Sequence, residues 1–206
     1  MNDDPADFIG VDLGIVNIAT TSTGKNFSGK QMNHRRRENN VRRARLHQRG
    51  TRSSKRRLIK ESGREARFAA NVNHAIAKEI VTEAKHTGQG IALEDLEGIL
   101  ARARSRKPQR VTLHSWSFHQ LGAFIAYKAK IAGVPVVHVD PAYTSQQCAK
   151  CRHIAKENRP TRDTFCCIRC GWSLPADENA SLNIAQRGVE VWAVSHAAER
   201  NTLLAV

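Results

Sequence analysis

The 206-residue sequence has little aromatic side-chain content, few acidic residues and no long apolar run. Phe, Trp and Tyr make up 5% of the chain, and 33 Lys and Arg outnumber 19 Asp and Glu. No apolar stretch approaches the roughly 18 to 20 residues that a membrane-spanning helix requires. The first residues, Met1 to Asp7, carry acids where a secretory signal has a basic stretch before an apolar one. We therefore expect a cytoplasmic protein without a membrane partner.

Cysteine is scarce, but four of the five cysteines are regularly spaced. Cys148 and Cys151 form one pair, Cys167 and Cys170 form another, and fifteen residues separate the pairs. This spacing is typical of a zinc ribbon, in which two tight turns direct four thiolates at one structural Zn²⁺. Four unrelated buried cysteines are the alternative. Cys166 cannot face the same metal as its neighbour Cys167, so we expect it to point away from a strand. Zinc binding fits a reducing cytosol better than a disulfide framework does.

The excess positive charge is concentrated in one segment. The formal net charge is +14, and residues 30–67 contain fifteen Lys and Arg against three Glu. Arginine dominates, and its planar guanidinium suits bidentate contact with phosphate. A charged helix that is merely solvated normally interleaves both signs, and this remains the alternative. The candidate nucleic-acid-binding residues are Arg35, Arg36, Arg37, Arg42, Arg43, Arg45, Lys55, Arg56 and Arg57.

Hydrophobic periodicity predicts an α/β fold with a mixed sheet. We expect strands at residues 8–13, 15–21, 26–29, 91–96 and 134–139. The basic segment is expected to be helical with a break near Gly50, followed by amphipathic helices at 64–85 and 115–132, the latter burying Phe118, Leu121, Ile125 and Ile131. The predicted units are a core at 1–143, a zinc ribbon at 144–172 and a final helix within 173–187 that ends near Ile184. Residues 188–206 show no clear pattern.

Three carboxylates occupy places where they can share a metal. Asp12 shares a strand face with Gly10, and Glu94 shares one with Ala92. If these strands are neighbours, the small residues leave a hollow beside two carboxylates, and Asp177 at the start of the last helix can point toward the same edge. Three carboxylates around divalent cations are the ligands of two-metal phosphodiester cleavage. The alternatives are a turn residue, a solvent-facing strand end and an ordinary helix N-cap.

The order of these motifs resembles the C-terminal half of TnpB, the OrfB-type protein of insertion-sequence transposons, which is related to type V CRISPR effector nucleases. Residues 10–14, 92–96 and 177–180 are similar to the first, second and third RuvC motifs of that family. Residues 139–146 and the ribbon with Asn158-Arg159-Pro160 are also similar to family stretches. The sequence departs from the family pattern at Arg152, where a glycine is usual, and at Ser181.

The resemblance implies an RNase H-like (RuvC) fold with an inserted zinc ribbon that contacts the target nucleic acid. It also implies that Asp12, Glu94 and Asp177 form a catalytic triad that binds Mg²⁺ and cleaves DNA. The expected partners are DNA and a guide RNA. The N-terminal recognition half of TnpB has no counterpart here, so we expect a truncated copy, a split-gene fragment with a separate recognition polypeptide, or a domain expressed alone. The alternative function is a non-catalytic transposon remnant that only binds nucleic acid.

Overall fold

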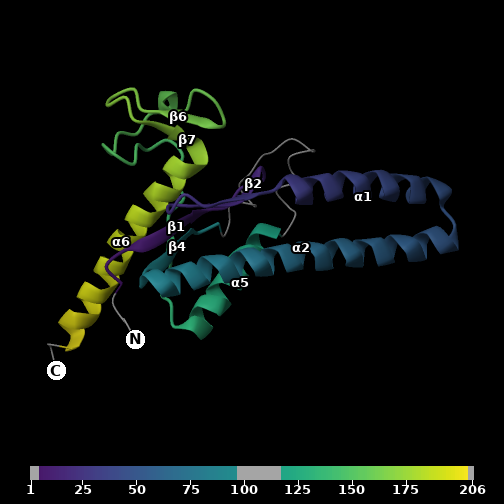
Figure 1. The fold of residues 1–206 in the computed structure, drawn as a ribbon, viewed down its shortest axis with the longest axis horizontal. Helices are drawn as coiled ribbons and strands as arrows, with labels where there is room; N and C mark the ends of the chain where they lie inside the picture. The colour runs from purple at the N-terminus through teal and green to yellow at the C-terminus, as the bar shows by residue number, and fades with distance from the viewer. Residues whose placement is uncertain (1–4, 97–116, 204–206) are drawn as a thin grey trace.

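The computed structural model describes residues 5–96 and 117–203 (Figure 1). The strands are β1 (Phe8–Asp12), β2 (Asn17–Thr21), β3 (Asn26–Ser28), β4 (Gly90–Glu94), β5 (Val136–Val139), β6 (Thr164–Cys166) and β7 (Ser173–Pro175). The helices are α1 (Lys30–Arg49), α2 (Arg52–Thr87), α5 (Ser117–Ala132) and α6 (Ala176–Leu203), with a short 3-10 helix at Lys156–Asn158. None of these helices carries an apolar stretch long enough to cross a membrane.

The main sheet is mixed, as the sequence predicts. Its strand order is β3-β2-β1-β4-β5, and β6 pairs with β7 in a separate two-stranded sheet. β1 runs antiparallel to β2 and parallel to β4, and β4 runs parallel to β5. In the β1–β4 register Gly10 pairs with Ala92 and Val11 with Leu93. One step further along, the same register brings Asp12 and Glu94 side by side at the carboxyl ends of their strands.

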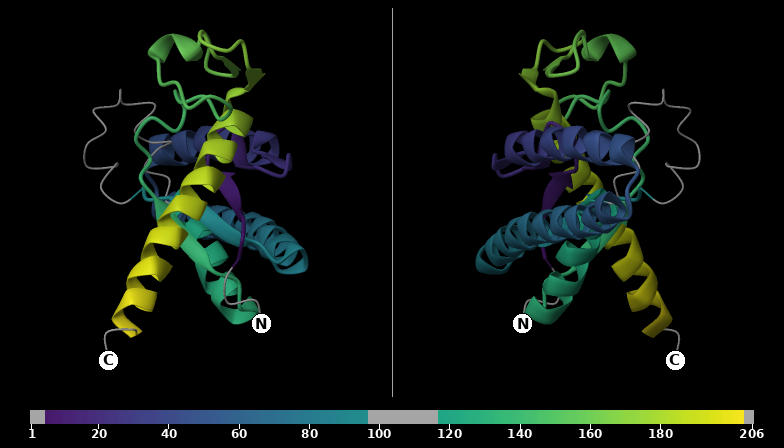
Figure 2. Two further views of the ribbon diagram at one scale, coloured as in Figure 1. Left: turned by 90° about the vertical axis from the view of Figure 1, so that its left-hand side faces the viewer. Right: turned by 90° about the vertical axis from the view of Figure 1, so that its right-hand side faces the viewer.

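The two faces of the sheet are covered by different helices. Ile9 and Val11 of β1, with Ile91 and Leu93 of β4, pack in one core with apolar residues of α2 and α5. On the other face Phe8, Ala92 and two valines of β5 pack with Ile184 and Trp192 of α6. Figure 2 shows α6 crossing the sheet, with the small β6–β7 unit at its N-terminal end. Since side chains alternate along a strand, Asp12 lies on the face that α6 covers.

The close approach of α6 to β1 depends on the absence of a side chain at Gly10. A Cβ atom there would lie 2.0 Å from the Ser181 carbonyl oxygen and 2.4 Å from the Ala185 nitrogen. At Gly188 a Cβ atom would lie 2.6 Å from the Cβ of Ala92. The space directly over Gly10 and Ala92 is therefore filled by α6, whereas a pocket is present beside the two carboxylates. The space left for a ligand is this pocket, at the strand ends.

The basic segment forms a helical hairpin that projects away from the sheet (Figure 1). α1 ends at Gly50, whose φ of 63° is the left-handed conformation that favours glycine. α2 begins after Thr51, whose side chain accepts a hydrogen bond from the Ser54 nitrogen. The predicted break near Gly50 is confirmed. A separate helix beginning at residue 64 is not observed, because α2 continues unbroken from Arg52 to Thr87.

Two further helix predictions need correction. α6 continues to Leu203, far beyond the predicted end near Ile184, because Gly188 faces the sheet and does not break the helix. On α5, Leu121, Ile125 and Ala129 are buried, whereas Ile131 is 81% exposed. Positions four apart follow one helix face, and Ile131 lies two residues, about 200°, from Ala129 and thus on the opposite side. The side chain of Phe118 lies outside the described part.

We predict that Gly10→Ala destabilises the fold by about 3 kcal/mol, because the methyl group meets backbone atoms that cannot move independently. Gly122→Ala is the matched control, since a Cβ atom at Gly122 of α5 has no neighbour within 4 Å. The control should gain up to about 1 kcal/mol from helix propensity. Urea unfolding of both variants tests this prediction, and equal stabilities would contradict the close approach of α6.

Candidate metal centres and nucleic-acid surface

The four paired cysteines converge on one point. The sulfur atoms of Cys148 and Cys170 lie 3.7 Å apart, those of Cys151 and Cys167 lie 3.6 Å apart, and all four lie within 4.8 Å of one another. Four sulfurs arranged tetrahedrally at 2.3 Å from Zn²⁺ are about 3.8 Å apart. The geometry and the donor set therefore fit a structural zinc ion. Cys166 is exposed on β6, outside this cluster, as expected.

The two knuckles share one backbone pattern. The Arg152 nitrogen donates to the Cys148 carbonyl and the Gly171 nitrogen to the Cys167 carbonyl, both at 2.9 Å. Arg152 and Gly171 are left-handed, with φ of 64° and 71°. This conformation costs a non-glycine residue roughly 1 to 2 kcal/mol, which is a steric reason for the glycine that the resemblance to TnpB leads us to expect at position 152. The Arg152 guanidinium forms a salt bridge with the Glu190 carboxylate of α6, at a distance of 2.6 Å.

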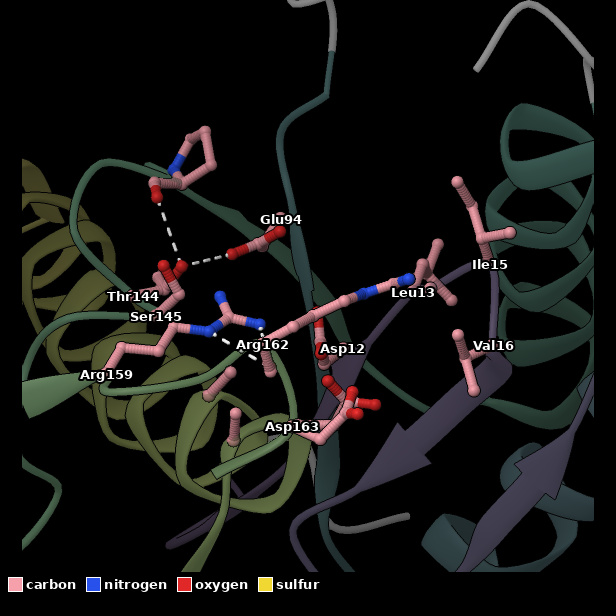
Figure 3. A pocket seen from close by; sticks show the side chains of 15 residues that line it. Asp12, Leu13, Ile15, Val16, Glu94, Thr144, Ser145, Arg159, Arg162 and Asp163 are labelled. Carbon is pink, nitrogen blue, oxygen red and sulfur yellow. Dashed lines mark hydrogen bonds between the residues drawn. The ribbon is translucent and has the colours of Figure 1, made fainter. Parts of the chain in front are cut away.

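The three candidate carboxylates line one pocket of about 350 Å³. Asp12 comes from the end of β1, Glu94 from the end of β4 and Asp177 from the first turn of α6. Figure 3 shows Asp12 and Glu94 in this pocket together with Arg159, Arg162 and Asp163. Residues that are far apart in sequence thus meet at one edge of the sheet. An acid-rich pocket of this kind suits a hard divalent cation.

Burial raises the pKa values of two carboxyl groups in the pocket. Burial, followed by the negative charges of Glu94 and Asp177, raises the pKa of Asp12 to about 7, and the nearby positive charge of Arg159 opposes this shift. Burial also raises the pKa of Glu94, against a hydrogen bond from Thr144 and the charge of Arg187. A bound cation would compensate this excess of negative charge. The electrostatics therefore fit a divalent metal at the pocket.

Sequence reasoning missed the side chains that orient and balance the carboxylates. The amide nitrogen of Asn17, at the start of β2, donates to Asp177 at 2.9 Å. Arg159 is held by two hydrogen bonds from its guanidinium to the Arg162 carbonyl oxygen, at 3.1 and 2.6 Å. The sequence signal for Arg159 was its place in Asn158-Arg159-Pro160, but that motif gave no indication that the arginine reaches the carboxylates of another element.

All nine candidate phosphate-binding residues lie on the α1–α2 hairpin, and all but the partly buried Arg36 are exposed. Burial lowers the pKa of Arg36, against the charge of Glu65. The Arg35 guanidinium lies 4.4 Å from the centre of the Phe68 ring, and Arg43 is 3.9 Å from Glu65. These contacts fix the positions of some basic side chains on the hairpin. Most of the remaining basic side chains are exposed to solvent.

Comparison with known proteins finds similarity to CRISPR-associated endodeoxyribonucleases and to TnpB-like proteins. Residues 118–184 match the family described as Cas12f1-like, TNB domain. The chain is 31% identical over 186 residues to the CRISPR-associated endodeoxyribonuclease Cas12f1 of Syntrophomonas palmitatica, covering 82% of this chain and 36% of that protein. It is 32% identical over 135 residues to the TnpB-like protein MJ0751 of Methanocaldococcus jannaschii, covering 65% and 48%.

A solved Cas12f1–sgRNA–target DNA complex has a similar fold, with a TM-score of 0.69 at 21% identity over 88% of this chain and 50% of that chain. The resemblance to TnpB expected from the motifs is therefore confirmed, and it extends to Cas12f proteins. The chain spans only about a third to a half of the two curated relatives.

We predict one zinc ion per chain, bound by the four clustered cysteines. Cys148→Ser and Cys170→Ser should each lose most of the metal, because a structural site needs all four ligands. Cys166→Ser, next to a ligand but outside the cluster, is the matched control and should retain it. Elemental analysis of the purified proteins measures the content. An equal loss from the control variant would contradict the ligand assignment.

We also predict a pH-dependent penalty from Asp12 when no divalent metal is present. Because its folded pKa of about 7 exceeds the unfolded value of about 3.9, the folded state holds a proton that the unfolded state releases. The penalty that Asp12 imposes on the free energy of unfolding is therefore absent below about pH 4. It grows as pH rises to about 7, to roughly 4 kcal/mol at most for a pKa shift of about three units.

Asp12→Asn should consequently stabilise the protein at pH 8 and do so less at pH 5.5. Urea unfolding in magnesium-free buffer at the two pH values measures the difference. Glu178→Gln is the control, since Glu178 neighbours Asp177 on α6 but does not line the pocket. A gain from Asp12→Asn that is the same at both pH values would contradict the raised pKa.

Proposed function

We propose that this chain is the magnesium-dependent, RuvC-like nuclease part of an RNA-guided DNA endonuclease of the TnpB and Cas12f type. The observation that carries the proposal is the shared pocket of Asp12, Glu94 and Asp177, three carboxylates from three separate segments. In this proposal the nuclease core comprises residues 1–143 and the helix that begins at 176, and residues 144–172 form the zinc ribbon. The helix that was expected to lie within 173–187 is extended here to Leu203.

An RNase H-like fold is supported by the arrangement of the sheet. Three antiparallel strands are followed by two strands that run parallel to the first, in the order β3-β2-β1-β4-β5. The carboxylates stand at the ends of the adjacent central strands β1 and β4 and at the start of the helix packed across them. This arrangement gives each acid a rigid support, as metal-dependent catalysis requires.

In the proposed reaction Asp12, Glu94 and Asp177 would hold the Mg²⁺ ions. When bound, two such ions supply an activated water for attack on the phosphodiester and stabilise the leaving oxygen. The chain itself orients Asp177 through Asn17 and Glu94 through Thr144. Arg159 adds a fixed positive charge at the pocket, where a substrate phosphate adds negative charge.

The hairpin of α1 and α2 is proposed to supply sequence-independent affinity for the nucleic-acid backbone. Its exposed arginines carry most of the excess charge of the chain, and contacts with phosphate release counterions. The solved relative was determined with an sgRNA and a target DNA. We propose DNA and a guide RNA as partners of this protein too, together with segments that correspond to the part of the relatives that this chain does not span.

The test is a cleavage assay with labelled DNA and Mg²⁺, on the chain alone and on a fusion to the part of the Syntrophomonas palmitatica Cas12f1 that lies outside the aligned region, supplied with guide RNA. We expect weak or no cutting by the chain alone and target-dependent cutting by the fusion. Asp12→Ala, Glu94→Ala and Asp177→Ala should each reduce cutting by at least about 10³-fold while DNA affinity changes little, because the acids serve the metal ions and not the grip on the backbone.

Two controls separate the roles of the pocket and the hairpin. Glu178→Gln should cut normally, since Glu178 does not line the pocket. Replacing Arg35, Arg36 and Arg37 by Ala should weaken DNA binding and flatten its dependence on salt by up to about three units of log–log slope. Salt-dependent DNA binding by a fusion that never cuts would favour the non-catalytic binding protein over the nuclease.

A further inference from the structure

Glu94 receives a short hydrogen bond from a residue outside the sheet. The Thr144 hydroxyl lies 2.6 Å from the Glu94 Oε1 atom and 3.1 Å from the Pro141 carbonyl oxygen (Figure 3). A hydroxyl has one proton to donate, and the shorter contact with a charged acceptor is the stronger of the two. Thr144 is only 5% exposed, so water does not compete freely for this bond. This hydrogen bond uses one lone pair of Oε1, and the remaining lone pairs of the carboxylate can bind a metal.

The loop that carries Thr144 is attached to α6 by hydrogen bonds from polar side chains on one face of the helix. Asn179, Asn183 and Arg187 are spaced by four residues and therefore lie on one face of the helix. The Arg187 guanidinium donates to the carbonyl oxygens of Asp140 and Ala142 at 2.6 and 2.8 Å, and to the side-chain oxygen of Gln147 at 2.7 Å.

Asn183 completes the attachment from the next turn of the helix. Its amide donates to the carbonyl oxygens of Thr144 and Gln147 at 2.9 and 2.7 Å. Asn183 is fully buried, so these hydrogen bonds are costly to lose. The backbone on both sides of the Thr144 hydroxyl is thus fixed by the same helix that carries Asp177.

The loop also stores backbone strain directly before Thr144. Tyr143 has a φ of 64° although it is not glycine, and its side chain is 59% exposed. A non-glycine residue in the left-handed region costs about 1 to 3 kcal/mol and persists where the surroundings determine it. Here the Arg187 and Asn183 hydrogen bonds hold the flanking residues, and the result is a hydroxyl directed at Glu94.

We infer that Thr144 is a positioning residue for the metal site, whose hydroxyl, held in place by Arg187 and Asn183, fixes the orientation of the Glu94 carboxylate. This inference rests on the proposed function, because it assigns Glu94 the role of a metal ligand. Outer-shell partners of this kind typically change metal affinity by about 10- to 100-fold when removed.

The test measures Mn²⁺ binding to the full chain by electron paramagnetic resonance, with Mn²⁺ as the probe for the magnesium site. Thr144→Val keeps the shape and removes the hydroxyl, and it should weaken Mn²⁺ binding by about 10-fold or more. Thr144→Ser restores the hydroxyl and should bind within about 3-fold of the unmodified chain, which a merely structural role would not predict. Thr87→Val, an exposed hydroxyl loss at the end of α2, is the matched control and should change nothing.

The outcomes separate this inference from the proposed function. If the unmodified chain bound no Mn²⁺, the nuclease proposal itself would fail. If it bound Mn²⁺ and Thr144→Val bound it equally well, only the positioning role would be overturned. Should Thr144→Val lose its fold or its zinc, Arg187→Lys provides the second variant: it keeps the charge but not the three-way hydrogen bonding, and it should weaken Mn²⁺ binding with zinc content intact. Unchanged Mn²⁺ affinity in that variant would also overturn the inference.

Discussion

The contact between the backbone of α6 and Gly10 of β1 is the constraint on which the site depends. With no side chain at Gly10, the helix lies directly on the strand, and its first turn reaches the strand end where Asp12 stands. A thicker layer of side chains, as on the opposite face of the sheet, would hold the helix farther from β1 and Asp177 farther from Asp12. Burial there is also the main reason why the pKa of Asp12 rises to about 7.

The same helix ties the zinc ribbon to the carboxylate pocket. Near its N-terminus Asn179 exchanges hydrogen bonds with the backbone of Gln147 and Ala149, and Gln186 donates to the Ala149 carbonyl. Both contacts lie at the first cysteine knuckle, so side chains of α6 bind the ribbon by hydrogen bonds to its backbone. The ribbon loop that carries Arg159 then returns to the carboxylates. The cysteine cluster is therefore linked through the ribbon backbone to a pocket that none of its cysteines lines.

Sequence reasoning succeeded where the determinant was local and failed where it was a contact between distant segments. The spacing of the cysteine pairs, the strands that carry Asp12 and Glu94, and the helix break near Gly50 each follow from a short motif, and all appear in the structure. The end of α6 was misplaced, because residues 188–206 show no clear pattern in the sequence although the helix continues through them to Leu203. The network from Arg187 to Thr144 had no local signature, since its acceptors are mostly backbone carbonyls.

The length of α1 determines how long a stretch of a bound ligand the helix can contact. Its 20 residues from Lys30 to Arg49 span about 30 Å. α1 begins beside Val16, which lines the carboxylate pocket and whose carbonyl accepts from the Gly29 nitrogen. A DNA duplex has one nucleotide per 3.4 Å along each strand, so about nine base pairs, nearly one turn of the duplex, can lie alongside α1. If the hairpin binds the duplex backbone as proposed, shortening or lengthening α1 would change the length of DNA that it covers without changing the carboxylate pocket.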